Sequence, residues 1–413
     1  MLPMPRIKSL LTFALFVIAI GLFPTIAHAQ KDSLKTEKPV ATEKKWFEKL
    51  SVKGYAQVRY NRLLETNPNL GCEQCDKSWG DNNGVFIRRA RITFSGQVTD
   101  RVFIYVQPDF AQAVSTNGQH YLQVRDYYAD LGLDKENNIK LRFGQSKVPF
   151  GFDNMQSSST RLALDRSDAL NSAAPNERDL GAFLLYTPAK IKKIYADIMK
   201  EGLKGSGDYG VFAFGVYNGQ SANRAEQNNN LHMAARITYP FVFGGQIIEV
   251  GAQAYTGKFV VNSDQLSAGT KINASKNYLD QRAGASFVLY PKPFGFVAEY
   301  NFGRGPEFNT ATDSIETKRL EGGYAQVCYK FNFNNQTFIP YSRAQYYKGG
   351  KKHEKDARSY DVKEIETGVE WLLNKSFEFT AGYVMSERRY DDFSKQNNRQ
   401  KGQLLRLQVQ MNF

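Results

Sequence analysis

The chain has 413 residues and a formal net charge of +13, and it is rich in phenylalanine (29), tyrosine (23) and glycine (33). After residue 29, no apolar run approaches the roughly 20 residues that a transmembrane helix needs. The basic balance does not indicate a nucleic-acid partner, because the basic residues are spread over strand positions and form no single cluster. This composition is typical of a β-barrel whose strands are apolar at every second residue.

The first 29 residues have the features of a signal peptide. Arg6 and Lys8 precede an apolar core over residues 10–22, and the small-residue pattern Ala-His-Ala closes the segment at 27–29. The core is too short for a membrane-spanning helix. We therefore expect cleavage before Gln30 and export from a bacterial cytoplasm to the outer membrane.

Residues 30–50 are lysine-rich and nearly free of apolar side chains, which predicts a flexible periplasmic lead-in. From residue 51 the hydrophobic pattern changes to a period of two: Ala90, Ile92 and Phe94 alternate with polar neighbours. Residues 51–413 are therefore predicted to form one all-β domain.

Joining the alternating runs predicts sixteen strands. They span residues 51–60, 85–97, 101–110, 120–133, 138–147, 179–187, 193–217, 230–240, 246–257, 277–290, 294–303, 319–331, 336–347, 359–373, 375–386 and 402–413. Short connections alternate with long ones (61–84, 148–178, 218–229, 258–276, 304–318 and 387–401), which is the outer-membrane pattern of short periplasmic turns and long outer loops. The stretch 193–217 contains a Gly-Ser-Gly interruption, so two strands or an insertion remain alternatives there.

Alternation alone fits both a soluble periplasmic β-sandwich and a barrel whose apolar face meets lipid. The last strand ends the chain on Phe413, which favours an outer-membrane barrel, and the closed pairing of a barrel satisfies every backbone group in the membrane. Sixteen strands enclose a water-filled lumen. We therefore predict a transmembrane antiparallel β-barrel that forms a pore and is surrounded by outer-membrane lipid.

Charged residues on the polar face of the strands are expected to line this pore. The first five strands carry a basic wall, opposed by Asp109 alone: Lys53, Arg59, Arg89, Arg91, Arg125, Lys140 and Arg142. The last third carries acidic residues, partly offset by Lys330, Arg343 and Arg406: Glu299, Glu364, Glu366, Glu370 and Glu378. Opposed walls predict a transverse field in the lumen, and the alternative for each single charge is an ordinary solvated side chain.

The long segment 147–178 is predicted to fold into the lumen as a constriction, because loops of this length are usually functional. Its candidate anion-binding residues are Lys147, Ser157, Ser158, Arg161 and Arg166. Arginine binds phosphate or carboxylate through paired N–H donors. The segment also carries four acidic residues, Asp153, Asp165, Asp168 and Glu177, so structural ion pairs are the alternative.

Cys72 and Cys75 form a Cys-x-x-Cys pair in a polar loop, and in an oxidising compartment this predicts a small disulfide. A zinc site needs further ligands, and this loop offers none. We predict no metal and no cofactor.

Two other functions are alternatives to a pore. A barrel-borne enzyme is disfavoured, because the three histidines after the signal (His120, His232 and His353) lie in no nucleophile motif. A surface-binding barrel protein would use the long loops 61–84 and 258–276, and it does not exclude a pore.

The first half of the chain resembles the phosphate-selective porin O and P family of outer-membrane channels. The resemblance lies in FIRRAR (86–91) with FSG (94–96), LQVRDYY (122–128), RFGQSKVPFG (142–151), RDLG (178–181), and ARI (235–237) with Pro240. The family implies a sixteen-stranded barrel, usually trimeric, whose third outer loop folds inward. Carried over by position, Lys147, Ser157, Ser158, Arg161 and Arg166 would bind anions, together with Arg89, Arg91 and Arg125 on the wall.

The resulting expectation is passive diffusion of small hydrophilic solutes, with a preference for anions such as phosphate or polyphosphate. The alternative is a general porin without phosphate selectivity.

Overall fold

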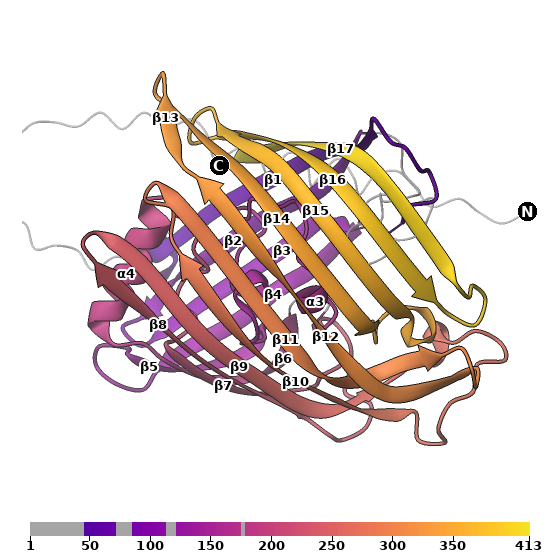
Figure 1. Cartoon of the computed structure of the whole chain (residues 1–413). Helices are drawn as coiled ribbons and strands as arrows, with labels where there is room; N and C mark the ends of the chain where they lie inside the picture. Colours follow the sequence, from indigo (N-terminus) through magenta and orange to yellow (C-terminus); the bar gives the residue numbers. More distant parts are fainter. Residues whose placement is uncertain (1–44, 72–84, 113–120, 175–177) are drawn as a thin grey trace, which may run out of the picture. The chain divides into compact units, whose positions relative to one another are not determined.

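The computed structural model describes residues 45–71, 85–112, 121–174 and 178–413, and the pair Cys72 and Cys75 lies outside them. The strands pair in one antiparallel sheet in which β1 bonds both β2 and β17, so the sheet closes on itself (Figure 1). Short β13 continues β12 after a break at Lys330, and both pair with β14. The result is a closed barrel of sixteen strands, as the alternation predicted.

The strands are β1 (Leu50–Leu63), β2 (Val85–Thr99), β3 (Val102–Gln112), β4 (Tyr121–Gly132), β5 (Ile139–Lys147), β6 (Arg178–Tyr186), β7 (Phe212–Tyr217), β8 (His232–Phe243), β9 (Gln246–Val260), β10 (Asn277–Leu289), β11 (Phe294–Asn309), β12 (Ser314–Tyr329), β13 (Phe331–Phe333), β14 (Gln336–Gly350), β15 (Ser359–Leu372), β16 (Phe377–Asp391) and β17 (Asn398–Asn412). The helical segments are α2 (Phe152–Met155), α3 (Asp168–Asn171), α4 (Ala189–Lys200) and the 3₁₀ turns η1 (Trp46–Lys49), η3 (Ser263–Gln265) and η4 (Lys355–Ala357).

The expected strand at 193–217 is wrong for most of its length, because helix α4 occupies 189–200 and only 212–217 is extended. Ile191, Tyr195 and Ile198 recur at spacings of four and three, which is the period of a helix face, and all three are buried. The insertion alternative is therefore the correct one. The described part of the chain contains no helix that is long and apolar enough to cross a membrane.

Two of the expected long loops are also wrong. β11 and β12 are joined by residues 310–313, and β16 and β17 by residues 392–397. The strands continue past the apolar stretches used to define them, because polar residues near the strand ends still pair across the sheet.

The two faces of each strand differ in chemistry. On β8, His232, Arg236 and Thr238 are buried inside the ring, whereas Met233 and Ile237 are exposed outside it. Exposed aromatic rings gather where strands meet the short turns: Phe243, Phe294, Phe333, Phe377 and Phe413. Such rings mark the interface between lipid and water in outer-membrane barrels.

Two of the β-bulges that interrupt the alternation fall on arginines. The β1–β2 register leaves Arg88 without an opposite residue, and the β3–β4 register does the same for Arg125. An extra residue shifts the inward and outward faces of the strand by one position. Asp126 and Asp130 consequently lie buried inside the ring.

The ring closes where the C-terminus meets β1. The Gly54 amide donates to the Phe413 carbonyl oxygen at 2.8 Å, and the Phe413 amide donates back to Gly54 at 3.0 Å. A Cβ on Gly54 would lie 2.3 Å from the Phe413 ring and 2.6 Å from the Arg91 carbonyl oxygen. The seam therefore requires a residue without a side chain at position 54.

We expect Gly54→Leu to destabilise the closed barrel by about 1–3 kcal/mol, the usual cost of overpacking. The fraction of unheated protein that migrates as the compact form in detergent gels should fall, and the urea midpoint should drop. Ala56→Leu, on the same outward face of β1, is the control and should change neither. Normal folding of the Gly54 variant would contradict the packing argument.

Candidate functional site in the barrel lumen

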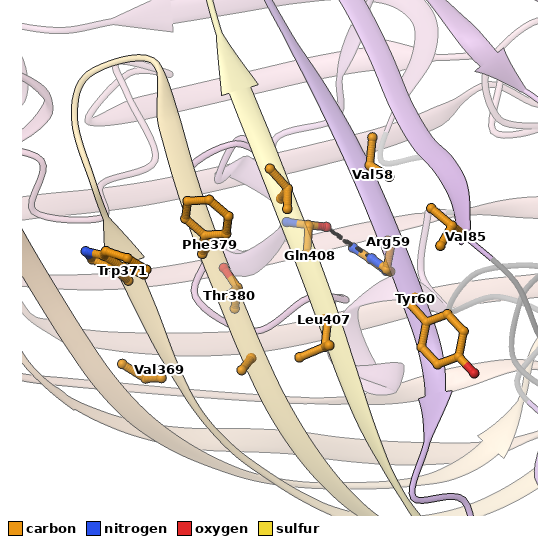
Figure 2. Close-up of a pocket in the computed structure, with 12 residues that line it drawn as sticks. Val58, Arg59, Tyr60, Val85, Val369, Trp371, Phe379, Thr380, Leu407 and Gln408 are labelled. Atoms are coloured by element: carbon orange, nitrogen blue, oxygen red, sulfur yellow. Dashed lines mark hydrogen bonds between the residues drawn. The ribbon is translucent and has the colours of Figure 1, made fainter.

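The apolar hollow shown in Figure 2 is not a solute site inside the barrel. It spans β15, β16, β17, β1 and β2, and it is lined mainly by outward side chains such as Val58, Val369, Trp371 and Leu407. Arg59 donates to Gln408 at 3.0 Å (Figure 2), and both of these polar side chains are buried within the ring. The charged and polar side chains that are candidates for contact with solutes lie in the lumen.

Residues 148–174, which we call the constriction segment, occupy that lumen. Most of their side chains are buried, including those of α2 and α3. The segment follows β5, and it bonds inward side chains on the far part of the ring, from β10 through β17 to β2: Gln57 (β1), Arg91 (β2), Arg282 (β10), Glu299 and Asn301 (β11), Gln345 (β14), Glu366 (β15), Arg388 (β16), and Arg406 and Gln410 (β17). These contacts place it across the lumen.

The carboxylate of Glu299 fixes the start of the constriction segment. It accepts the backbone N–H groups of Phe152 at 2.7 Å and Asp153 at 3.1 Å, and Gln253 donates to it at 3.0 Å. Gly151 has φ +82°, and a Cβ there would lie 2.6 Å from Leu170, so only glycine suits this bend. The side chain of Glu299 thus satisfies two backbone N–H groups at the start of α2 that have no partner within the helix.

Asp165 and Asp168 attach the later part of the segment to the wall. Asp165 pairs with Arg406 on β17 and with Arg59 on β1, the latter at 3.4 Å. Asp168 accepts from Arg388 at 3.0 Å and from Lys351 at 2.5 Å. The expected ion pairs therefore exist, but they join the segment to the wall.

Burial raises the pKa of the Asp165 carboxyl, but Arg406 and Arg59 lower it by more, so the net shift is downward. A lowered pKa in the folded state means that the ionised form stabilises the fold at neutral pH. This stabilisation is lost only as the pH falls below the ordinary carboxyl pKa and through the lowered one.

The acidic residues of the opposite wall also hold other segments in place. Glu366 accepts the Leu164 N–H at 3.2 Å, and Glu364 accepts from Arg388 at 2.6 Å. Glu370 pairs with Lys204 from the connection between β6 and β7. Basic partners thus offset the charges of Glu364 and Glu370, which weakens the expected transverse field.

The expectation that Asp109 alone opposes the basic wall is wrong. The bulge at Arg125 turns Asp126 and Asp130 inward, so strict alternation assigned them to the wrong face. Three ion pairs of 2.7 Å result: Arg91 with Asp109, Arg142 with Asp130, and Arg178 with Asp126. Of the remaining wall residues, Lys140 lies 3.8 Å from Asp208, and Lys53 is exposed near the short turns.

Arg89 interacts electrostatically with four other guanidinium groups, and we call the five residues the arginine cluster: Arg59, Arg88, Arg89, Arg91 and Arg161. Arg89 is buried at 4% exposure and donates to Gln57 at 2.7 Å, and no described residue bonds its Nε. Arg88 joins the group only through the bulge on β2, and sequence alternation missed it. Among described residues, Asp109 and Asp165 pair with members of the cluster.

Of the five predicted anion-binding residues, Arg161 belongs to this cluster and Ser158 contacts it. Ser158 Oγ lies 2.9 Å from Tyr55 Oη and 3.0 Å from Arg91 Nη1. Arg161 lies within electrostatic reach of Arg89. One serine and one arginine predicted from the sequence therefore lie beside arginines of the barrel wall.

The other three predicted residues bond groups of the constriction segment and do not contact the arginine cluster through any bond described above. Lys147 donates to the Gln156 carbonyl oxygen at 2.9 Å, and Arg166 donates to the same oxygen at 2.9 Å. Ser157 bonds Ser159 at 2.8 Å. Among described residues, no group of three histidine, cysteine or carboxylate side chains is arranged to hold a metal ion.

Replacing Asp165 tests how firmly the segment is attached. Asp165→Asn leaves Arg59 and Arg406 without their shared carboxylate, and breaking a buried pair typically costs about 3–5 kcal/mol. We expect a lower urea midpoint and larger current fluctuations in single-channel recordings. Asp264→Asn, an exposed carboxylate in η3, is the control. An unchanged midpoint for the Asp165 variant would mean that other contacts hold the segment.

The sequence profile of the family described as phosphate-selective porin O and P matches residues 70–413. Three solved structures each align with 88% of this chain over 97% of their own length. They are the channel DcaP of Acinetobacter baumannii (15% identity, TM-score 0.51), OmpT of Vibrio cholerae (12%, 0.51) and Salmonella typhi OmpF in complex with daunomycin (14%, 0.52). These similarities support the barrel fold. Comparison with curated protein sequences gave no match.

Proposed function

The chain belongs to the phosphate-selective porin O and P family and is an outer-membrane porin, and from this premise we propose that its lumen prefers small anions. The observation that carries the proposal is the arginine cluster, in which the buried Arg89 interacts electrostatically with four other guanidinium groups and Arg91 donates to Ser158 of the constriction segment at 3.0 Å. Like charges at short range repel one another more strongly inside a protein than in water. An anion between them relieves this repulsion and accepts their N–H donors.

The geometry supports anion preference more strongly than phosphate selectivity. Guanidinium groups and a serine hydroxyl suit phosphate, and the family name suggests it. However, Lys147 and Arg166 bond backbone carbonyl oxygens of the constriction segment, and Asp165 adds a negative charge beside the cluster. A general anion-preferring porin is therefore the second candidate. Titrating phosphate against a chloride current separates the two, since only a phosphate site gives saturable block.

We expect Arg89→Gln to lower the ratio of chloride to potassium permeability by severalfold, because the variant removes a buried charge that forms no ion pair with the described residues. Arg91→Gln should have a smaller effect, since Asp109 already pairs with Arg91. Reversal potentials across a planar bilayer in a potassium chloride gradient measure both changes.

Arg101→Gln is the control, because Arg101 is exposed at a short turn outside the lumen. Its reversal potential should equal that of the unaltered protein. A cation preference in the unaltered protein would overturn the anion assignment without affecting its identity as a porin.

We further propose that the porin is exported through a signal peptide cleaved before Gln30 and assembles as a homotrimer in contact with outer-membrane lipid. The signal peptide is supported by the sequence pattern of residues 1–29, and the homotrimer by the trimeric assembly that is usual in the family. N-terminal sequencing of the membrane protein should begin at Gln30, and light scattering in detergent should give three times the chain mass. A monomer mass would contradict the assembly.

A further inference from the structure

The connection between β6 and β7 differs from every other connection at the same end of the barrel. There, the other turns between described strands are at most six residues long, as in 133–138, whereas residues 187–211 contain α4 and an irregular return. We call residues 187–211 the lower segment. Its helix lies beside the ends of β5 and β8 (Figure 1).

The lower segment packs against the inside of the barrel wall. Ile191, Tyr195 and Ile198 on one face of α4 are buried with Ile247 and Val288, which occupy inward positions on β9 and β10. Apolar residues at inward positions of a water-filled barrel are unusual unless something covers them. The covering element here is α4, so part of this mouth is filled by protein.

The lower segment also reaches the opposite side of the ring. Near its start, Lys192 donates to the carbonyl oxygens of Glu136 and Asn137, each at 2.8 Å, in the turn between β4 and β5. Further on, Lys204 pairs with Glu370 on β15, which lies opposite β6 in the sixteen-stranded order. The segment therefore crosses the lumen below the constriction segment.

The two crossing segments contact each other. Phe152 of α2 is buried in the same apolar cluster as Ile191 and Ile198. Gln156 of the constriction segment donates to the Lys204 carbonyl oxygen at 2.5 Å. A shift of one segment thus requires a shift of the other.

We propose that the lower segment is a second size-selecting element of the porin, and that it also supports the constriction segment from below. Its position across the mouth limits the cross-section that remains open to solutes. Its contacts with Phe152 and Gln156 restrict the motion of the constriction segment. This role concerns solute size and is independent of the anion preference proposed above.

The first test removes the element. Joining Pro188 to Tyr209 through a Gly-Ser-Gly-Ser linker should raise the single-channel conductance at least about twofold, since pore width sets conduction. Liposome swelling should extend to larger neutral sugars. Reversal potentials should still show the preference of the unaltered protein, so a failure here and a failure of the anion assignment are distinguishable.

The second test does not depend on folding of the deletion variant. Lys204→Met with Glu370→Gln releases the far end of the lower segment while nearly keeping side-chain volume. We expect larger current fluctuations and a higher sugar size limit. The matched control is Lys193→Met with Asp197→Asn, which removes a pair of 2.7 Å on the exposed face of α4 and should change neither. If the released variant folds, as judged by its compact form in detergent gels, and keeps the original size limit and noise, the proposal is overturned.

Discussion

Burial of charge in a narrow lumen is the constraint on which the rest of this structure depends. A buried ion without a partner costs several kcal/mol, so charges that point inward must find partners on neighbouring strands or on segments that enter the lumen. Asp165, Asp168 and Glu299 show the result, because each of them connects the constriction segment to the wall. The charges predicted to select solutes are therefore, for the most part, the ones that hold the segment in place.

Since most inward charges hold the constriction segment in place, the groups that lie among like charges are the ones that matter for solute selection. Arg89 shares its surroundings with four other guanidinium groups. The bulge at Arg88 concentrates that charge, whereas the bulge at Arg125 brings in Asp126 and Asp130, which neutralise Arg178 and Arg142. These two β-bulges thus determine which part of the lumen is basic.

Much of the barrel was predictable from sequence, since period-two alternation and turn spacing follow directly from a sheet with one polar and one apolar face. All sixteen expected strands overlap strands of the structure, but 193–217 does so only over its last six residues, 212–217. The exception, 193–217, failed because a helix inside a barrel mouth leaves only a weak signal: apolar residues such as Ile247 and Val288 at polar positions. Arg88 and Asp126 were misassigned because a bulge is visible only in the pairing of two strands.

The constriction segment touches both strands of the seam that closes the barrel. Asp165 joins Arg59 on β1 to Arg406 on β17, and the neighbouring residues Ser158 and Ser159 accept bonds from Gln57 and Gln410 on the same two strands. The first and last strands of the chain are thus connected from inside by the segment that narrows the pore. Evolution of solute preference at these positions is therefore tied to the assembly of the barrel, and new selectivity must arise through substitutions that still allow the ring to close.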